Sequence, residues 1–282
     1  MIPLNENLKG KTAVITGGSG VLTSAMAKEL ARHGTNIVIL NRNKATGESI
    51  VAEIEQRGGT AIAISCDVLD KDSVKAAEAL TLSMFGCCDI LINGAGGNHQ
   101  DATTSDEVLS EADLLDVNSR TLYDLEIEGI ERVINLNLLG TIIPSQVFSK
   151  NMIGLNGATI INISSMSAYT PLTKIPAYSA SKAAINNYTA WLAVYLSEVS
   201  IRVNAIAPGF FLTNQNRNLL MQEDGSLTQR SKKIIDHTPM KRFGLAEDLL
   251  GTLIWLADDN LSGFVTGVTI PIDGGFMAYS GV

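Results

Sequence analysis

The sequence is poor in cysteine and in aromatic residues. Only three of its 282 residues are cysteines, Cys66, Cys87 and Cys88, and 5% are aromatic. Three cysteines, two of them adjacent, provide neither a disulfide framework nor a Cys-x-x-Cys site. We therefore expect buried thiols in a reducing compartment, and the cytoplasm is the simplest such location.

Basic residues and long apolar runs are also scarce. The chain has 21 Lys and Arg against 29 Asp and Glu, which gives a net charge of −8. Nucleic-acid binding needs a basic patch, and this balance argues against it. No apolar run approaches the length that spans a bilayer, and residues 1–11 lack the layout of a signal peptide. Neither a nucleic acid nor a membrane is therefore an expected partner.

What the chain does contain is a regular alternation of strand and helix patterns. Hydrophobic residues make up 45% of it, and no low-complexity linker or repeat divides it, so we expect one domain over residues 1–282. Strands are predicted at 12–16, 36–40, 61–65, 89–92, 159–163, 201–206 and 265–272, with helices at 22–33, 45–57, 70–85, 130–151, 178–199 and 246–258. This alternation predicts an α/β fold with a doubly wound, parallel, seven-stranded sheet and helices on both faces.

The stretch from Ile160 to Ala184 holds the side chains best suited to chemistry. Its strand ends at a pair of serines, the second of which is Ser165, and a helical pattern begins at Tyr178 after a loop in which two prolines exclude a helix. Tyr178 and Lys182 are four residues apart and so share one helix face. A neighbouring ammonium lowers the pKa of a tyrosine, and a serine hydroxyl across the cleft can hold a substrate oxygen against the phenol. These groups suit proton transfer to or from an alcohol oxygen.

Each motif alone has an ordinary explanation, because Tyr-x-x-x-Lys is commonly a solvated helix face and Ser-Ser is commonly a turn. The order of strand, Ser165, Tyr178 and Lys182 resembles the catalytic core of the short-chain dehydrogenases/reductases. The resemblance implies a Rossmann-type fold, a nicotinamide cofactor and a homotetramer. It also implies that Tyr178 moves the proton, that Ser165 orients the reacting oxygen and that Lys182 bonds the nicotinamide ribose. Asn137, in Asn135-Leu-Asn-Leu-Leu-Gly-Thr141, matches the family's structural asparagine, which holds a proton-relay water.

Two glycine-containing turns are predicted to hold the cofactor. Residues 17–20 lie between a strand and a helix, the setting that binds a pyrophosphate. The family pattern Thr-Gly-x-x-x-Gly-x-Gly is altered here, because Val21 and Thr23 stand where its second and third glycines do; we expect an altered turn that still works. Asn93-Gly-Ala-Gly resembles the family's Asn-Asn-Ala-Gly turn with its second asparagine changed to Gly94. The residues expected at the cofactor are Gly17, Ser19, Gly20, Val21, Leu22, Asn41, Arg42, Asp67, Val68, Asn93, Gly94, Ala95, Gly96, Tyr178, Lys182, Pro208, Gly209, Phe211 and Thr213.

The choice between NAD and NADP depends on the end of the second strand. An acid there bonds the ribose 2′-hydroxyl of NAD, whereas a nearby arginine accepts the 2′-phosphate of NADP. The chain has no acid at this point: Asn41 fits both cofactors and Arg42 favours NADP. The alternative is that Arg42 stacks on the adenine or faces solvent.

Two segments lie outside the regular pattern. Residues 98–131 form an acidic extension that is long for the family, and residues 210–244 correspond to its substrate lid. His99 leaves the carboxyl end of a central strand, where ligands bind in open α/β sheets. The alternatives for His99 are a surface imidazole or a metal ligand, and no second His or Cys at ligand spacing supports a metal.

Several short sequence segments indicate a narrower class of substrate. Gly17-Gly-Ser-Gly-Val-Leu, Pro171-Leu-Thr-Lys-Ile-Pro-Ala-Tyr and Pro208-Gly-Phe-Phe-Leu-Thr-Asn-Gln-Asn-Arg resemble the D-mannonate oxidoreductase (fructuronate reductase) group. A sugar acid needs a cation for its carboxylate, with Arg217 as the first choice and Lys174 the second. The substrate residues expected on this basis are Asn98, His99, Ser165, Lys174, Asn214 and Arg217.

Other functions remain open from the sequence. The nearest alternatives are a gluconate 5-dehydrogenase-like enzyme and another polyol or keto-acid reductase. A non-catalytic, cofactor-sensing binding protein belongs to a different class. Such a protein typically loses the tyrosine or lysine, whereas Tyr178 and Lys182 are both present here.

Overall fold

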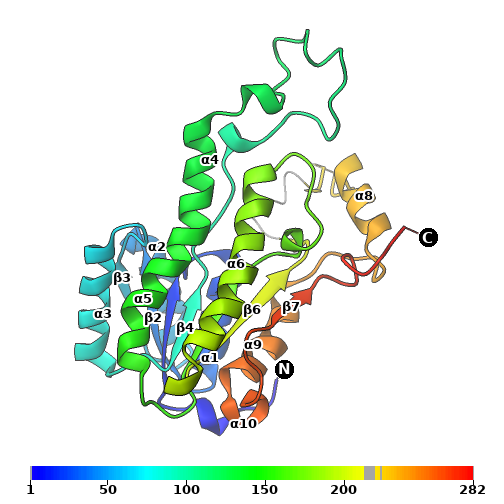
Figure 1. The fold of residues 1–282 in the computed structure, drawn as a ribbon. Coiled ribbons are helices and arrows are strands. Elements are labelled where there is room, and N and C mark those ends of the chain that lie inside the picture. Colours follow the sequence, from blue (N-terminus) through cyan, green and yellow to red (C-terminus); the bar gives the residue numbers. More distant parts are fainter. Residues whose placement is uncertain (1, 213–219, 223, 282) are drawn as a thin grey trace.

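One parallel sheet forms the centre of the molecule. A computed structural model describes residues 2–212, 220–222 and 224–281. Within these residues, seven strands lie in the order β3-β2-β1-β4-β5-β6-β7, and every neighbouring pair is parallel (Figure 1). The strands are β1 (Thr12–Thr16), β2 (Asn36–Asn41), β3 (Ala61–Ser65), β4 (Ile90–Asn93), β5 (Thr159–Ile163), β6 (Arg202–Pro208) and β7 (Thr269–Ile272). The predicted doubly wound parallel sheet is confirmed, although β7 begins four residues later than its apolar pattern suggested.

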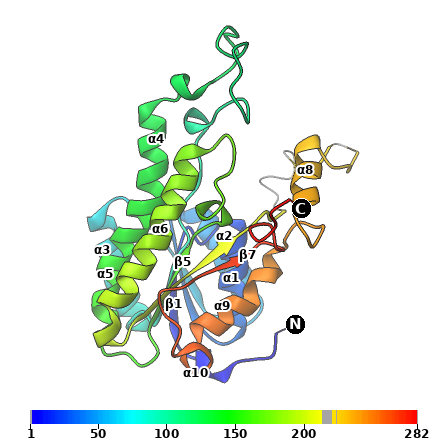
Figure 2. The same cartoon turned by 45° about the vertical axis from the view of Figure 1, so that its right-hand side comes forward.

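Helices cover both faces of the sheet (Figure 1, Figure 2). Their bounds are α1 (Val21–Arg32), α2 (Lys44–Glu55), α3 (Lys71–Phe85), α4 (Ile127–Ile134), α5 (Gly140–Met152), α6 (Pro176–Tyr195), α8 (Gln229–His237), α9 (Leu250–Ala257) and α10 (Asp259–Ser262). Helices α1, α2 and α9 share one apolar core with the sheet, and α3, α5 and α6 share the other. None of the helices in the described part of the chain is long and apolar enough to cross a bilayer.

The two cores follow directly from the alternation of side chains along each strand. In β1, Ala13 and Ile15 lie in the core under α1, whereas Val14 lies in the core under α5. Successive strand residues point to opposite faces of a sheet, and both faces here are covered. The strands therefore consist of unbroken apolar runs rather than alternating ones.

The strand order reverses between β1 and β4. Strand β1 pairs with β2 on one side and β4 on the other, with Thr16 opposite both Leu40 and Asn93. The connections from these strands leave in opposite directions, which opens a crevice beyond their carboxyl ends. The fold thus places the two predicted cofactor turns side by side.

The helix predicted at 130–151 differs from the prediction. The structure has α4 from Ile127, a π-helical turn over Asn135–Leu139, and then α5 from Gly140. The π-helical turn surrounds the buried Asn137. Residue periodicity cannot reveal such a turn, because it depends on a partner elsewhere in the chain.

A second correction concerns Pro176. We expected this proline to exclude a helix before Tyr178, but it is the first residue of α6. Proline suits this position because the first helical N–H has no partner within the helix. The helix ends at Tyr195 rather than at Val199, with a 3₁₀ turn over Ser197–Val199 and Ser200 in the left-handed region at φ 61°.

The acidic extension projects away from the sheet beyond α4 (Figure 1). It contains two short 3₁₀ turns, Gln100–Ala102 and Leu122–Asp124, and its final residues form the start of α4. Contacts hold its base to the remainder of the chain: the N–H of Thr104 donates to the carbonyl of Lys174 at 2.9 Å, and Glu107 pairs with Lys233 at 3.1 Å.

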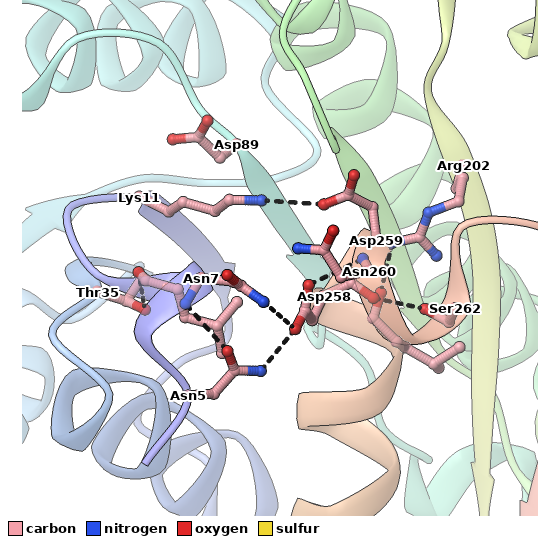
Figure 3. A network of polar contacts seen from close by, with 12 residues as sticks. Asn5, Asn7, Lys11, Thr35, Asp89, Arg202, Asp258, Asp259, Asn260 and Ser262 are labelled. Carbon is pink, nitrogen blue, oxygen red and sulfur yellow. Dashed lines mark hydrogen bonds and ion pairs between the residues drawn. The ribbon is translucent and has the colours of Figure 1, made fainter.

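A buried carboxylate, that of Asp258, ties the segment before β1 to the start of α10 (Figure 3). Asp258 is 1% exposed, and one of its oxygens accepts hydrogen bonds from the Nδ2 atoms of Asn5 at 2.7 Å and Asn7 at 3.0 Å. Its other oxygen accepts from the N–H of Asn260, at the start of α10. Burial alone raises the pKa of Asp258, but the bonds from Asn7, Asn5 and Asn260 outweigh it and lower that pKa below its ordinary value of 3.8.

We predict that Asp258→Asn destabilises the fold by about 1.5–3 kcal/mol, the contribution of a hydrogen bond to a charged group. Because the folded pKa is depressed, the stabilisation is fully present above pH 3.8 and is lost as pH falls through the folded value. Urea unfolding of wild type and variant at neutral and at acid pH measures this, and the difference between them should shrink in acid.

Asp259→Asn is the matched control. Its carboxylate lies 3.8 Å from Lys11 and its side chain is 30% exposed, so the loss should stay below about 1 kcal/mol. Equal losses for the two variants would show that the buried network is not what stabilises this part of the fold.

Candidate active site

The predicted acid/base pair lies in the first two turns of α6. Lys182 is buried, its Nζ donates to the carbonyl of Ile163 at 2.8 Å, and it lies 5.5 Å from the centre of the Tyr178 ring. The Tyr178 ring is half-buried and packs on a small apolar cluster that includes Val133 and Ala177. The end of β5 and the start of α6 thus bring the tyrosine and lysine together, as the spacing predicted.

The structure distinguishes the two serines after β5. The hydroxyl of Ser164 bonds Asn186 on α6 and so serves the scaffold. The hydroxyl of Ser165 accepts from the N–H of Ser167 at 3.2 Å and from the Ser167 hydroxyl at 3.0 Å, and it lies near enough to Tyr178 to oppose the rise in that residue's pKa. The role of Ser165 in orienting the reacting oxygen stays a prediction.

The pKa values differ from the sequence prediction. Burial raises the pKa of Tyr178, and only the hydrogen bond from Ser165 opposes that effect. Burial also lowers the pKa of Lys182 to about 8. The expected lowering of the Tyr178 pKa by Lys182 is thus not found in the protein alone: burial is the largest effect on the pKa of each group, and the ammonium donates to the Ile163 carbonyl.

Asn137 is fully buried in the π-helical turn and bonds the backbone after β4. Its Nδ2 donates to the carbonyls of Gly97 and Val133, each at 2.8 Å, and its Oδ1 accepts from the N–H of Gly97 at 3.2 Å. These contacts tie the mid-helix asparagine to the backbone after β4. Its proton-relay water remains a prediction.

The turn after β1 keeps the features of a phosphate-binding turn. Gly17 is in the left-handed region at φ 61°, and a side chain there would meet the backbone of Ala95 at 2.9 Å. Gly20 precedes the first turn of α1, so Val21 and Leu22 open the helix. A helix N-terminus with close backbone approach suits a pyrophosphate. The second and third glycines of the family pattern are thus not needed for the turn to form.

The turn after β4 is held by a residue that the sequence analysis missed. The hydroxyl oxygen of Thr16, the last residue of β1, accepts the N–H groups of Gly94 at 3.0 Å and Ala95 at 3.1 Å. A side chain at Gly96 would lie 2.6 Å from Oδ1 of Asn137 and 3.3 Å from Nζ of Lys182. The preceding Asn93 is buried and donates to Ser145 and Asn162.

The predicted adenine side has a buried and an exposed member. Asn41 is buried, and its amide bonds Thr46 and the N–H of Ser19. Arg42 is exposed, and its guanidinium has no hydrogen-bonding or ion-pairing partner among the residues that the structure describes. Asp67 accepts from the N–H of Leu69, and Val68 is buried beside it. Arg42 is thus free to meet a 2′-phosphate.

The lid is described only in part. Pro208 ends β6, the N–H of Gly209 donates to the carbonyl of Ile272 at 2.9 Å, and Phe211 is buried. Helix α8 lies within the lid segment 210–244. The predicted contacts at Thr213, Asn214 and Arg217 lie outside the described residues.

His99 contacts a cation that sequence reasoning missed. The Nε2 of His99 lies 2.8 Å from Nη1 of Arg132, and its Nδ1 lies 3.2 Å from a carboxylate oxygen of Asp101. Arginine is always a donor, so Nε2 of His99 accepts from Arg132, while its Nδ1 also lies 3.3 Å from the N–H of Asp101, which donates to it. Arg132 lies in a helix whose start the sequence placed three residues too late, and nothing local marked it.

Two other predicted substrate residues are engaged by the extension. The amide of Asn98 donates to Thr103 at 2.8 Å. Lys174 adopts a left-handed backbone at φ 71°, and its ammonium donates to the carbonyl of Ser105. A neutral carbonyl leaves the charge of Lys174 uncompensated, so the residue stays a candidate. In the described parts of the chain, no group of three His, Cys, Asp or Glu side chains is arranged to hold a metal.

Comparisons with known proteins identify the family of the chain. A family model for short chain dehydrogenases matches residues 11–224. An uncharacterized oxidoreductase of Bacillus subtilis (strain 168), UxuB, is 58% identical over all of both chains, and the 2-dehydro-3-deoxy-D-gluconate 5-dehydrogenase of Escherichia coli (strain K12) is 33% identical over 96% of this chain and 97% of its own. A Haemophilus influenza crystal structure with bound NAD, proposed to be a D-mannonate oxidoreductase, is 53% identical with a TM-score of 0.95 over 99% of each chain. The chain belongs to the short-chain dehydrogenase family.

We predict that Tyr178→Phe lowers turnover by about 10²–10⁴-fold, the usual contribution of a general acid or base. Binding of NAD should change little, because only the phenol oxygen is removed. Steady-state turnover and calorimetric NAD titration measure the two effects. Tyr188→Phe, on the same helix, is the matched control and should keep its activity. Near-normal turnover in Tyr178→Phe would show that another group moves the proton.

Arg42→Ala should weaken NADP binding about 10- to 100-fold, because a charge-assisted bond to the 2′-phosphate is lost, and should leave NAD binding nearly unchanged. Titration with both cofactors tests this. Lys44→Ala is the control, since Lys44 is nearby but pairs with Glu48 at 3.4 Å. Equal weakening of NAD and NADP would mean that Arg42 does not bind that phosphate.

Proposed function

We propose that this member of the short-chain dehydrogenase family interconverts D-mannonate and D-fructuronate by hydride transfer with a nicotinamide cofactor. The proposal is carried by the likeness to the NAD-bound Haemophilus structure, at 53% identity and a TM-score of 0.95. The arrangement of Ser165, Tyr178 and Lys182 at the end of β5 and the start of α6 supports it, because an alcohol oxygen can be bonded there by two hydroxyl groups.

The residues present fit a dinucleotide. Gly17 and Gly96, one on each side of the crevice, have no side chain that could cover the backbone. A side chain at either position would meet other atoms of the protein at 2.9 Å or less. The N-terminus of α1 would hold the pyrophosphate, and Lys182 would bond the nicotinamide ribose. When bound, the nicotinamide supplies or accepts the hydride.

The protein's own contribution is to hold and move one proton. In reduction, the hydroxyl of Tyr178 donates its proton to the ketone oxygen, and the raised pKa keeps that proton in place at neutral pH. In oxidation, the phenolate takes the alcohol proton, and the ammonium of Lys182, 5.5 Å from the ring, stabilises the phenolate. Ser165 holds the reacting oxygen in both directions.

The charge of a sugar acid requires a cation in the cleft, because an unpaired buried carboxylate is costly. Three cations are candidates. Arg217 is the first choice because of its position in the lid segment, Lys174 bonds the carbonyl of Ser105 in the extension, and Arg132 contacts His99. The similarity to a 2-dehydro-3-deoxy-D-gluconate 5-dehydrogenase, at 33% identity, favours a related sugar acid as the second candidate substrate.

A cytoplasmic homotetramer is part of the same proposal. The outer face of α6 carries Trp191 and Tyr195, whose rings stack with centres 5.0 Å apart and which are 55% and 69% exposed. Aromatic side chains exposed together suit a subunit contact.

Kinetics with D-mannonate, D-gluconate and an uncharged polyol of similar length test the proposal. D-mannonate should be the best substrate with NAD or NADP. Arg217→Ala should raise the KM for D-mannonate by about 10- to 150-fold, the loss of a hydrogen bond to a charged group, and leave the polyol unaffected. Lys174→Ala and Arg132→Ala rank the remaining cations in the same assay.

The outcomes separate the alternatives. Preference for D-gluconate, with the same dependence on a cation, would replace D-mannonate by the second substrate. If none of the three variants distinguishes the acid from the polyol, the sugar-acid proposal fails while the dehydrogenase assignment stands.

A further inference from the structure

Two departures from the family's motifs meet in space. Thr23 replaces the third glycine of the first turn, and Gly94 replaces the second asparagine of the other. Thr23 lies in the first turn of α1 and is 4% exposed. A side chain built on Gly94 would put its first carbon 2.3 Å from Cγ2 of Thr23, far inside contact distance. With threonine at position 23, a side chain at position 94 would force one of the two residues to move.

The threonine is fixed by its hydroxyl. Oγ1 of Thr23 donates to the carbonyl of Gly17 at 2.6 Å and also lies 3.1 Å from the carbonyl of Gly20. These are the first and last residues of the turn after β1, so the hydroxyl braces that turn from the helix side. β-Branched side chains are restricted in χ1 within helices, and the same rotamer directs the methyl group at Gly94.

The two turns touch at a second point. A side chain on Gly17 would put its first carbon 2.9 Å from the backbone of Ala95. The methyl of Thr23 against Gly94 and the backbone of Gly17 against Ala95 therefore set the spacing of the two turns. The dinucleotide binds in the crevice where these turns meet, at the reversal of strand order.

We propose that Thr23 and Gly94 form a coupled pair that positions the two cofactor-binding turns relative to each other. Thr23 is a positioning residue: it braces one turn with its hydroxyl and sets the distance to the other with its methyl. Gly94, which has no side chain, leaves room for this methyl group. The inference concerns the cofactor and holds for any alcohol substrate.

A double-mutant cycle tests the pair. Gly94→Ala should raise the Kd for NAD at least tenfold, measured by calorimetry on the full chain. Thr23→Ser keeps the hydroxyl and removes the methyl, so it should bind NAD nearly as wild type does. In the Thr23→Ser background, the effect of Gly94→Ala should fall at least fivefold. The remainder is expected, because a side chain at 94 also comes within 2.9 Å of the Thr16 carbonyl.

Thr23→Val separates the hydrogen bond of the Thr23 hydroxyl from the contact between its methyl group and Gly94. Valine keeps both branches and cannot donate, so this variant should fold, should weaken NAD binding, and should not rescue Gly94→Ala. Thermal unfolding without cofactor is recorded for each variant, because a packing role alone would change Tm and leave the Kd for NAD unchanged.

Three results would overturn the proposal. Additive effects of Gly94→Ala and Thr23→Ser on the Kd for NAD would show that the residues act independently. An unchanged Kd in Gly94→Ala, with or without a lower Tm, would show that the contact does not position the cofactor turns. If Gly94→Ala does not fold, Thr23→Val tests the proposal. An unchanged Kd for NAD in Thr23→Val would show that the hydroxyl of Thr23 does not position the turn.

Discussion

The carboxamide of Asn137 bonds both polar groups of the Gly97 peptide backbone, and the geometry of the site depends on that pairing. Its donor and acceptor match the carbonyl and the N–H of one glycine, at 2.8 Å and 3.2 Å, in a fully buried setting. A buried amide left without partners would cost several kcal/mol, on the order of 2–7. The helix opens a π-turn around Asn137 to make these bonds. In return, the strand end that leads to His99 is fixed against the helix that carries Arg132.

Close packing continues from this pairing to the acid/base group. Gly96 lies between Asn137 and Lys182, with no room for a side chain. Lys182 is held in turn by the carbonyl of Ile163, and its burial lowers its pKa to about 8 while burial raises the pKa of Tyr178. A tyrosine that keeps its proton beside a lysine that releases its own readily is a pair whose charge state responds to what binds next to it. The fold therefore positions Tyr178 and Lys182, and the bound reactants would supply the groups that change their charge state.

The sequence predicted the features that depend on local pattern. Apolar runs such as Ala13–Ile15 identify buried parallel strands, because both faces of the sheet are covered. The spacing of Tyr178 and Lys182 identifies a shared helix face, since residues four apart are neighbours on any helix. The features that escaped prediction are contacts between distant residues. The methyl of Thr23 meets Gly94, and His99 faces Arg132 across 33 residues. Two motif departures that looked separate in the sequence are one contact in space.

A crystal structure of the enzyme with NAD and D-mannonate tests the central claim most directly. The account predicts that the oxygen to be oxidised lies about 2.6–3.2 Å from the hydroxyls of both Tyr178 and Ser165, with the carboxylate against Arg217, Lys174 or Arg132. Lys182 should then turn from the Ile163 carbonyl to the nicotinamide ribose. A sugar acid bound without contact to Tyr178, or with its carboxylate in solvent, would contradict the account.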